Sequence, residues 1–104
     1  MTSAPDADRR RAGARLWSHH RAAPFPDRFR AEEVAGVDLV VVDADIAGCV
    51  YTWLHSSGPL DRARLTVLRE HLRDLASTLP LLDGPLEREY VGRLRELAAL
   101  VLAS

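Results

Sequence analysis

Residues 38–55, DLVVVDADIAGCVYTWLH, decide the fold because they form the first strongly periodic apolar stretch of the chain. On a helix with about 100° per residue, one set of apolar side chains shares a face. That set is Leu39, Val42, Ile46, Cys49, Val50 and Trp53. A second set fills the adjoining arc and comprises Val40, Ala44, Ala47, Tyr51 and Leu54. A helix that is apolar around most of its girth is typical of the central helix of a small bundle.

The first half of this stretch, residues 38–45, can be read in two ways. Asp38 is a good N-cap, and Val37 and Val42 stand at the spacing of a hydrophobic staple around it, which favours a helix. The run from Leu39 to Val42 is mostly β-branched, however, and short apolar runs also occur as buried strands. We favour the helix and keep the strand as the alternative.

Two further amphipathic helices are predicted downstream, over residues 59–79 and 85–102. In the first, leucines recur at spacings of three and four residues, at positions 65, 68, 72, 75 and 79. In the second, the stripe is Leu86, Tyr90, Leu94, Leu97 and Val101. A proline stands at the start of each, where the first helical position favours it. Short connections favour antiparallel neighbours, so the predicted fold is all-α, with a three-helix bundle core over 38–55, 59–79 and 85–102.

The N-terminal third has a different composition. Residues 1–8 are small, polar and proline-bearing, and we expect a disordered tail there. Residues 9–37 form a basic arm, in which a short helix is expected over 9–20 and Pro24-Phe25-Pro26 forces an extended turn. We expect this irregular or partly helical arm to wrap or cap the bundle of residues 38–104, so that the chain is one domain.

Charge and cysteine content narrow the class of protein. Residues 1–30 carry a net charge of +4 and residues 31–104 a net charge of −5. We expect the basic arm to lie on the acidic body. The single cysteine, Cys49, excludes an internal disulfide, and no apolar run approaches the ~20 residues that span a bilayer. The expected location is therefore the cytoplasm, without a membrane partner.

Asp43-Ala44-Asp45 is the strongest candidate in the sequence for a catalytic motif. With the apolar run before it, the segment VDLVVVDADIAG (residues 37–48) resembles the nucleophile motif of haloacid-dehalogenase-like phosphotransferases. It also resembles the phosphoacceptor strand of response-regulator receivers. In either family, Asp43 would take the phosphoryl group. Both families also need a downstream lysine, and this chain has none. We therefore assign no catalytic residue.

If residues 38–55 are helical, Asp43 falls inside the buried arc. A buried carboxylate must be paired or protonated. We expect an arginine from another helix as its partner, with a ligand-facing or partner-facing Asp43 as the alternative. Asp45 lies on the polar strip and is expected to be solvated, whereas Cys49 is expected to be a buried, inert thiol.

The histidines do not form a recognisable metal site. His19 and His20 are adjacent, so on a helix they point in different directions and make a poor chelate. Neither they nor His55 and His71 have the close ligand spacing of a metal site. We expect no metal and no cofactor, and we interpret the adjacent pair as exposed polar side chains and His71 as a helix-boundary residue.

The basic arm interleaves arginines with aromatic residues, and this composition can bind single-stranded nucleic acid. Its candidate contacts are Arg9, Arg10, Arg11, Arg15, Trp17 and Arg21. The acidic body argues against this function, because a nucleic-acid-binding domain is usually basic overall. The preferred interpretation is that the aromatic side chains anchor the arm onto the bundle.

Three helices cannot enclose every apolar position, so we expect surplus apolar surface and hence an interface. The sequence predicts a non-enzymatic helical interaction module, such as a small regulator or adaptor, that acts through protein–protein contacts. A homodimer is the leading expectation. The alternatives are a nucleic-acid-binding accessory protein that uses residues 9–30 and a small-ligand or metal-binding domain around Asp43.

Overall fold

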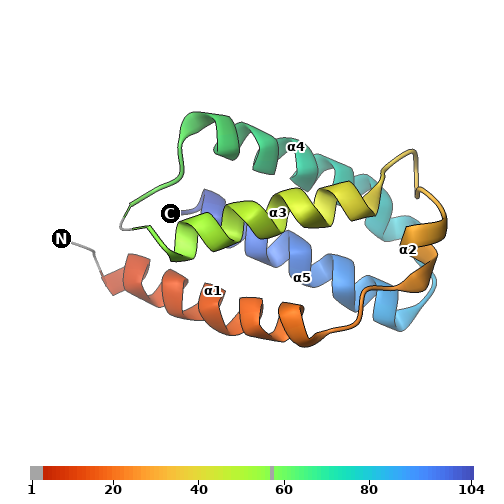
Figure 1. Ribbon diagram of the computed structural model, residues 1–104, viewed down its shortest axis with the longest axis horizontal. Coiled ribbons are helices and arrows are strands. Elements are labelled where there is room, and N and C mark those ends of the chain that lie inside the picture. The colour runs from red at the N-terminus through yellow and green to blue at the C-terminus, as the bar shows by residue number, and fades with distance from the viewer. Residues whose placement is uncertain (1–3, 57) are drawn as a thin grey trace.

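The computed structural model describes residues 4–56 and 58–104 and shows four long helices that run alternately up and down (Figure 1). These helices are α1 (Ala4–Ala22), α3 (Leu39–Leu54), α4 (Arg62–Thr78) and α5 (Pro85–Leu102). The short helix α2 (Asp27–Ala31) comes between α1 and α3 in the chain, and the 3-10 turn η1 (Leu79–Leu81) extends α4. The all-α prediction is confirmed. Within the described ranges, the one β pairing is an isolated bridge between Val34 and Val37.

The predicted helix starts are confirmed at α3 and α5 and shifted at α4. The side chain of Asp38 caps α3 and accepts two backbone N–H groups at 3.0 and 3.4 Å. α4 begins after Asp61 rather than at Pro59, because the Asp61 carboxylate accepts the N–H of Arg64 at 2.8 Å and closes the first turn. This hydrogen bond lowers the pKa of Asp61.

The four long helices pack around α3 and α5. α5 contacts all three of the others, α3 contacts α1 and α4, and α1 and α4 flank the pair on opposite sides (Figure 1). The predicted apolar face of α3 is buried at every position, so the helix rather than the strand is correct for this stretch. Trp53, Leu68, Leu75 and Leu97 are completely buried at the centre of the core.

One residue of the predicted stripes lies outside the core. Leu86 is 73% exposed, because it stands in the first turn of α5 and lines a surface hollow instead of facing α3. The other members of that stripe, from Tyr90 to Val101, are buried as predicted. In the part of the chain that the structure describes, no helix is both long and apolar enough to cross a bilayer.

The N-terminal segment corrects two expectations. Residues 4–8 are helical rather than disordered, whereas residues 1–3 of the expected tail lie outside the described residues. The short helix expected over 9–20 is part of the 19-residue helix α1, which packs along the bundle as its fourth member. The three-helix core is therefore completed by α1 and not merely capped by an irregular arm.

α1 docks through close approach and polar contacts more than through apolar area. A Cβ atom added to Gly13 would lie 2.5 Å from Cζ3 of Trp53, so the glycine lets α1 reach that ring. The Arg10 guanidinium lies 5.2 Å from the centroid of the same ring. It donates hydrogen bonds to the carbonyl oxygens of Trp53, Ser56 and Gly58 at 2.6, 3.1 and 3.1 Å. Arg10 thus binds the carbonyl groups at the end of α3, where a cation is electrostatically favoured.

Candidate functional site

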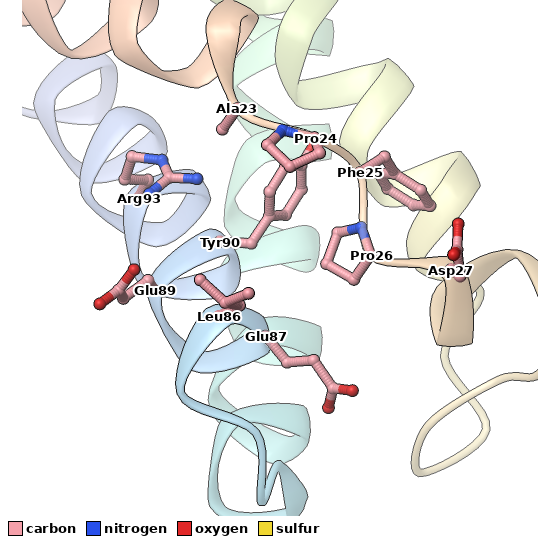
Figure 2. A pocket seen from close by; sticks show the side chains of 10 residues that line it. All are labelled: Ala23, Pro24, Phe25, Pro26, Asp27, Leu86, Glu87, Glu89, Tyr90 and Arg93. Carbon is pink, nitrogen blue, oxygen red and sulfur yellow. The ribbon is translucent and has the colours of Figure 1, made fainter.

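The connection from α1 to α2 runs alongside α5 as an extended strap, residues 23–26 (Figure 2). Its prolines keep the backbone out of helical geometry, as the sequence predicts. The Phe25 ring meets the Tyr90 ring edge-on, with centroids 5.3 Å apart. Beside the strap lies a hollow of about 410 Å³, whose wall includes Pro24, Pro26 and Leu86. We call it the strap hollow.

A polar cluster lies below the strap, and Asp43 is its centre. The Tyr90 hydroxyl donates to Oδ1 of Asp43 at 2.9 Å, and Nε2 of His20 lies 2.9 Å from the same oxygen. Because a carboxylate oxygen only accepts, Nε2 of His20 carries the hydrogen. The His20 and Tyr90 rings also pack together, with centroids 4.5 Å apart. The cluster therefore joins α1, α3 and α5 at one point.

This cluster corrects two predictions. Asp43 is paired, but with a histidine and a tyrosine rather than with an arginine. His20 is not exposed, because its side chain retains 4% of its accessible surface, whereas His19 is exposed as expected. Positions 13, 17 and 20 follow helical spacing on one side of α1, and this periodicity was the signal that could have placed His20 against the bundle. Nδ1 of His20 is buried without a hydrogen-bond partner.

Burial changes the acidity of Tyr90. Desolvation raises the pKa of its hydroxyl well above the ordinary value, and the negative charge of Asp43 raises it further. The guanidinium groups of Arg93 and Arg30 oppose this effect. Tyr90 is therefore a neutral hydrogen-bond donor at physiological pH.

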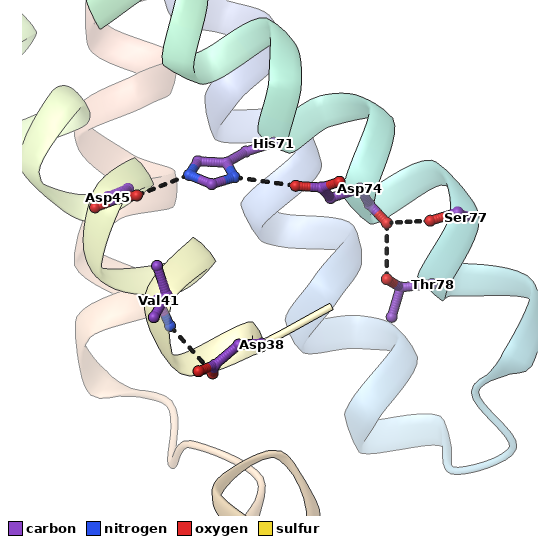
Figure 3. A network of polar contacts seen from close by, with 7 residues as sticks. All are labelled: Asp38, Val41, Asp45, His71, Asp74, Ser77 and Thr78. Carbon is purple, nitrogen blue, oxygen red and sulfur yellow. Dashed lines mark hydrogen bonds and ion pairs between the residues drawn. The ribbon is translucent and has the colours of Figure 1, made fainter. Parts of the chain in front are cut away.

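A second polar cluster lies on the other flank of α3 and links it to α4 (Figure 3). Nε2 of His71 lies 2.8 Å from Oδ2 of Asp45, and its Nδ1 lies 3.3 Å from Oδ2 of Asp74. Asp45 is therefore paired and not simply solvated, and His71 bridges two carboxylates instead of marking a helix boundary. With both ring nitrogens facing acceptors, the doubly protonated ring can donate to both.

The structure uses several of the candidate arm contacts internally. Arg9 and Arg11 form ion pairs with Asp6 and Asp8 one turn earlier on α1, and Arg10 binds the end of α3. Trp17 is partly buried against the core and stacks on His20, with centroids 6.3 Å apart. The two ion pairs stay within α1, whereas the contacts of Arg10 and Trp17 favour the interpretation that the segment is anchored to the bundle.

The remaining two candidate contacts are on the surface of α1. Arg15 lines a groove between α1 and α5, and Arg21 is exposed. Neither forms an ion pair among the residues that the structure describes. The arm therefore offers fewer unpaired cations to a nucleic acid than its composition suggests.

Apolar surface remains on the outward side of α3. Val40, Ala44, Ala47 and Tyr51 are spaced by four, three and four residues and form one stripe, which we call the α3 seam. Val40 is 46% exposed and Tyr51 is 56% exposed. The sequence places these residues in the arc next to the buried face, and the structure leaves Ala44 exposed as well and Ala47 half-buried.

Within residues 4–56 and 58–104, no group of three or more His, Cys, Asp or Glu side chains could hold a metal ion. Cys49 is buried, and burial raises the pKa of its thiol. No known family model, curated protein or solved structure matches this chain.

Proposed function

We propose that this protein is a non-enzymatic helical interaction module, that it acts through the α3 seam, and that the partner of this seam is a second copy of the chain. The carrying observation is the spacing of four apolar side chains over about three helical turns, of which Val40, Ala44 and Tyr51 are exposed and Ala47 is half-buried. A four-three-four pattern of apolar residues is the pattern by which two helices pack along each other.

The seam is complementary to itself when two copies run antiparallel. In that arrangement Tyr51 lies opposite Val40 of the second copy, and Ala44 lies opposite Ala47. The small residues in the middle let the two helices approach closely, and the larger residues cover the two ends. One two-fold axis relates both halves, as most homodimers require.

A hollow beside the seam fits the largest side chain of this contact. The hollow has a volume of about 270 Å³ and is lined by Phe25, Arg30, Val40, Asp43, Ala44 and Tyr90. Helical side chains lean toward the N-terminus of their helix, so Tyr51 of the second copy leans from Val40 toward Asp43 and Ala44. Its ring would meet the aromatic side chains there, and its hydroxyl could donate to Asp43.

The expected dimer is weak and reversible. One helix face buries less area than the roughly 800 Å² per partner of a standard interface. Concentration would therefore control the proportion of dimer, which is a suitable property for a small regulator. We expect this module to act in the cytoplasm, where a lone buried thiol such as Cys49 stays reduced.

Sedimentation velocity over a concentration series tests the proposal. The wild-type chain should pass from monomer to dimer as its concentration rises to the high micromolar range. Tyr51→Glu should stay monomeric, because it places a charge in the contact. Leu81→Glu is the matched control, since Leu81 is 54% exposed on η1, outside the seam, and it should behave as wild type. A wild-type monomer throughout, or a dimer that survives Tyr51→Glu, would overturn the proposal.

A further inference from the structure

A second surface feature, independent of the α3 seam, lies between α1 and α5. It is a groove of about 330 Å³, and we call it the α1–α5 groove. It is lined by Ala12, Arg15, Leu16, His19, Arg93, Glu96 and Leu100. We propose that this groove binds a small organic anion, with a carboxylate or phosphate head and a short apolar chain.

The head of such a ligand would lie among three basic side chains. Arg15 and His19 stand one turn apart on α1, and Arg93 lines the opposite wall on α5. None of the three forms an ion pair among the described residues. The Arg93 guanidinium lies 5.5 Å from the centroid of the Tyr90 ring, a contact that leaves its charge without a carboxylate partner in the described chain. An anion in the groove would compensate for the excess of positive charge of these side chains over the single carboxylate of Glu96.

The apolar part of the ligand follows from the remaining wall. Leu16 and Leu100 are partly buried and pack against the core, so their outer surfaces form an apolar floor along the groove. An inorganic anion would leave this floor exposed to water, whereas an alkyl chain would cover it. The groove therefore favours an amphipathic anion over a bare one.

The neighbouring strap hollow sets the orientation of the ligand. Arg93 lines both the groove and the strap hollow, and Figure 2 shows it at one end of that hollow. The strap hollow also presents the carboxylates of Asp27, Glu87 and Glu89, which repel an anion. The head is thus expected on the α1 side of Arg93, next to Arg15 and His19.

Binding of six-carbon probes to the full chain tests the inference. In an amide-resolved NMR titration, hexanoate or hexyl phosphate should shift signals of α1 and α5 saturably. Hexylammonium, with the same chain and the opposite charge, should not. Inorganic phosphate should bind more weakly than hexyl phosphate. Equal binding of hexanoate and hexylammonium, or no saturable shift with either anion, would overturn the proposal.

Variants locate the head group. Arg15→Gln should weaken binding of the anionic probe about tenfold, which is the effect of losing one charge-assisted hydrogen bond. Arg21→Gln is the matched control, because Arg21 is exposed on the same helix but does not line the groove. Arg93→Gln should weaken binding similarly, with the helical signal in circular dichroism as a check on folding. Unchanged affinity in Arg15→Gln would contradict the assignment, whatever the oligomeric state of the chain.

Discussion

Asp43 and Asp45 are two residues apart on α3, yet their side chains serve opposite flanks of the bundle. Asp43 faces α1 and α5 and accepts from groups that are almost completely buried, and its side chain is 25% exposed. Asp45 faces α4 and is 48% exposed beside His71. Side chains two positions apart on a helix point in directions that differ by about 200°. An aspartate therefore accepts hydrogen bonds from buried side chains on one flank, whereas an aspartate on the other flank pairs with a histidine at the surface.

Removing the buried hub should have the largest effect. Asp43→Ala leaves the Tyr90 hydroxyl and Nε2 of His20 buried without their acceptor, and unsatisfied buried groups cost about 1–3 kcal/mol each. We expect a loss of about 3 kcal/mol in the free energy of unfolding, measured by urea denaturation. Asp45→Ala is the matched control and should cost less than about 1 kcal/mol. Equal losses in the two variants would mean that the clusters do not differ as described.

Disturbing the contact of α1 with Trp53 should cause the second-largest loss in the free energy of unfolding. Gly13→Ala places a methyl group within 2.5 Å of a rigid ring, so we expect a loss of about 2 kcal/mol by thermal or urea unfolding. Gly92→Ala is the matched control, because a Cβ at Gly92 meets nothing within 4 Å. The free energy of unfolding of that variant should rise by up to about 1 kcal/mol, because alanine has a higher helix propensity than glycine. A neutral Gly13→Ala would show that α1 does not approach Trp53 as closely as described.

Alkaline pH should reveal the buried tyrosine. The chain has no lysine, so cysteine and tyrosine dominate its side-chain titration above pH about 8.5. The pKa of Cys49 and that of Tyr90 are both raised in the folded state. A group whose pKa is raised on folding contributes its full stabilisation when the pH is below its pKa in the unfolded chain. That stabilisation is lost as the pH rises through its pKa in the folded protein. For Tyr90, stability should fall above pH about 10 by up to about 1.4 kcal/mol per pH unit.

Urea unfolding at stepped pH measures this dependence. Tyr90→Phe should be less stable at neutral pH, because Asp43 loses a donor, but its stability should decline less steeply above pH about 10. An identical decline in the two proteins would assign the effect to another group.

The surface pair should give the smallest effect. A double-mutant cycle between Asp45→Asn and His71→Gln should return a coupling below about 1 kcal/mol that shrinks as salt is added. The same cycle between Asp43→Asn and His20→Gln should return a larger coupling that salt barely changes. A strong, salt-independent coupling at Asp45 would remove the contrast between the two flanks.

Periodicity made the core of α3, α4 and α5 predictable, because each buried face follows an apolar stripe. α1 carries no such stripe, and its docking depends on a glycine at one point of close approach and on Arg10 at the end of α3. These are pairwise fits between distant residues, which composition does not encode. Asp43 was predicted to be buried and paired, but its pairing with His20 and Tyr90 was not predicted, because helical spacing shows which face a side chain shares and not which distant side chain it meets.

A distance measurement across the proposed dimer tests the central claim most directly. A spin label at position 52 (Thr52→Cys, with Cys49→Ala) lies beside the seam. In the antiparallel pairing, the two labelled positions are separated by about 20 Å along the helix axis. A parallel pairing of α3 would bring them within about 10 Å. A concentration-dependent distance distribution at the longer separation would support the α3 seam as the self-association surface. A short distance, or no dipolar coupling at high concentration, would contradict it.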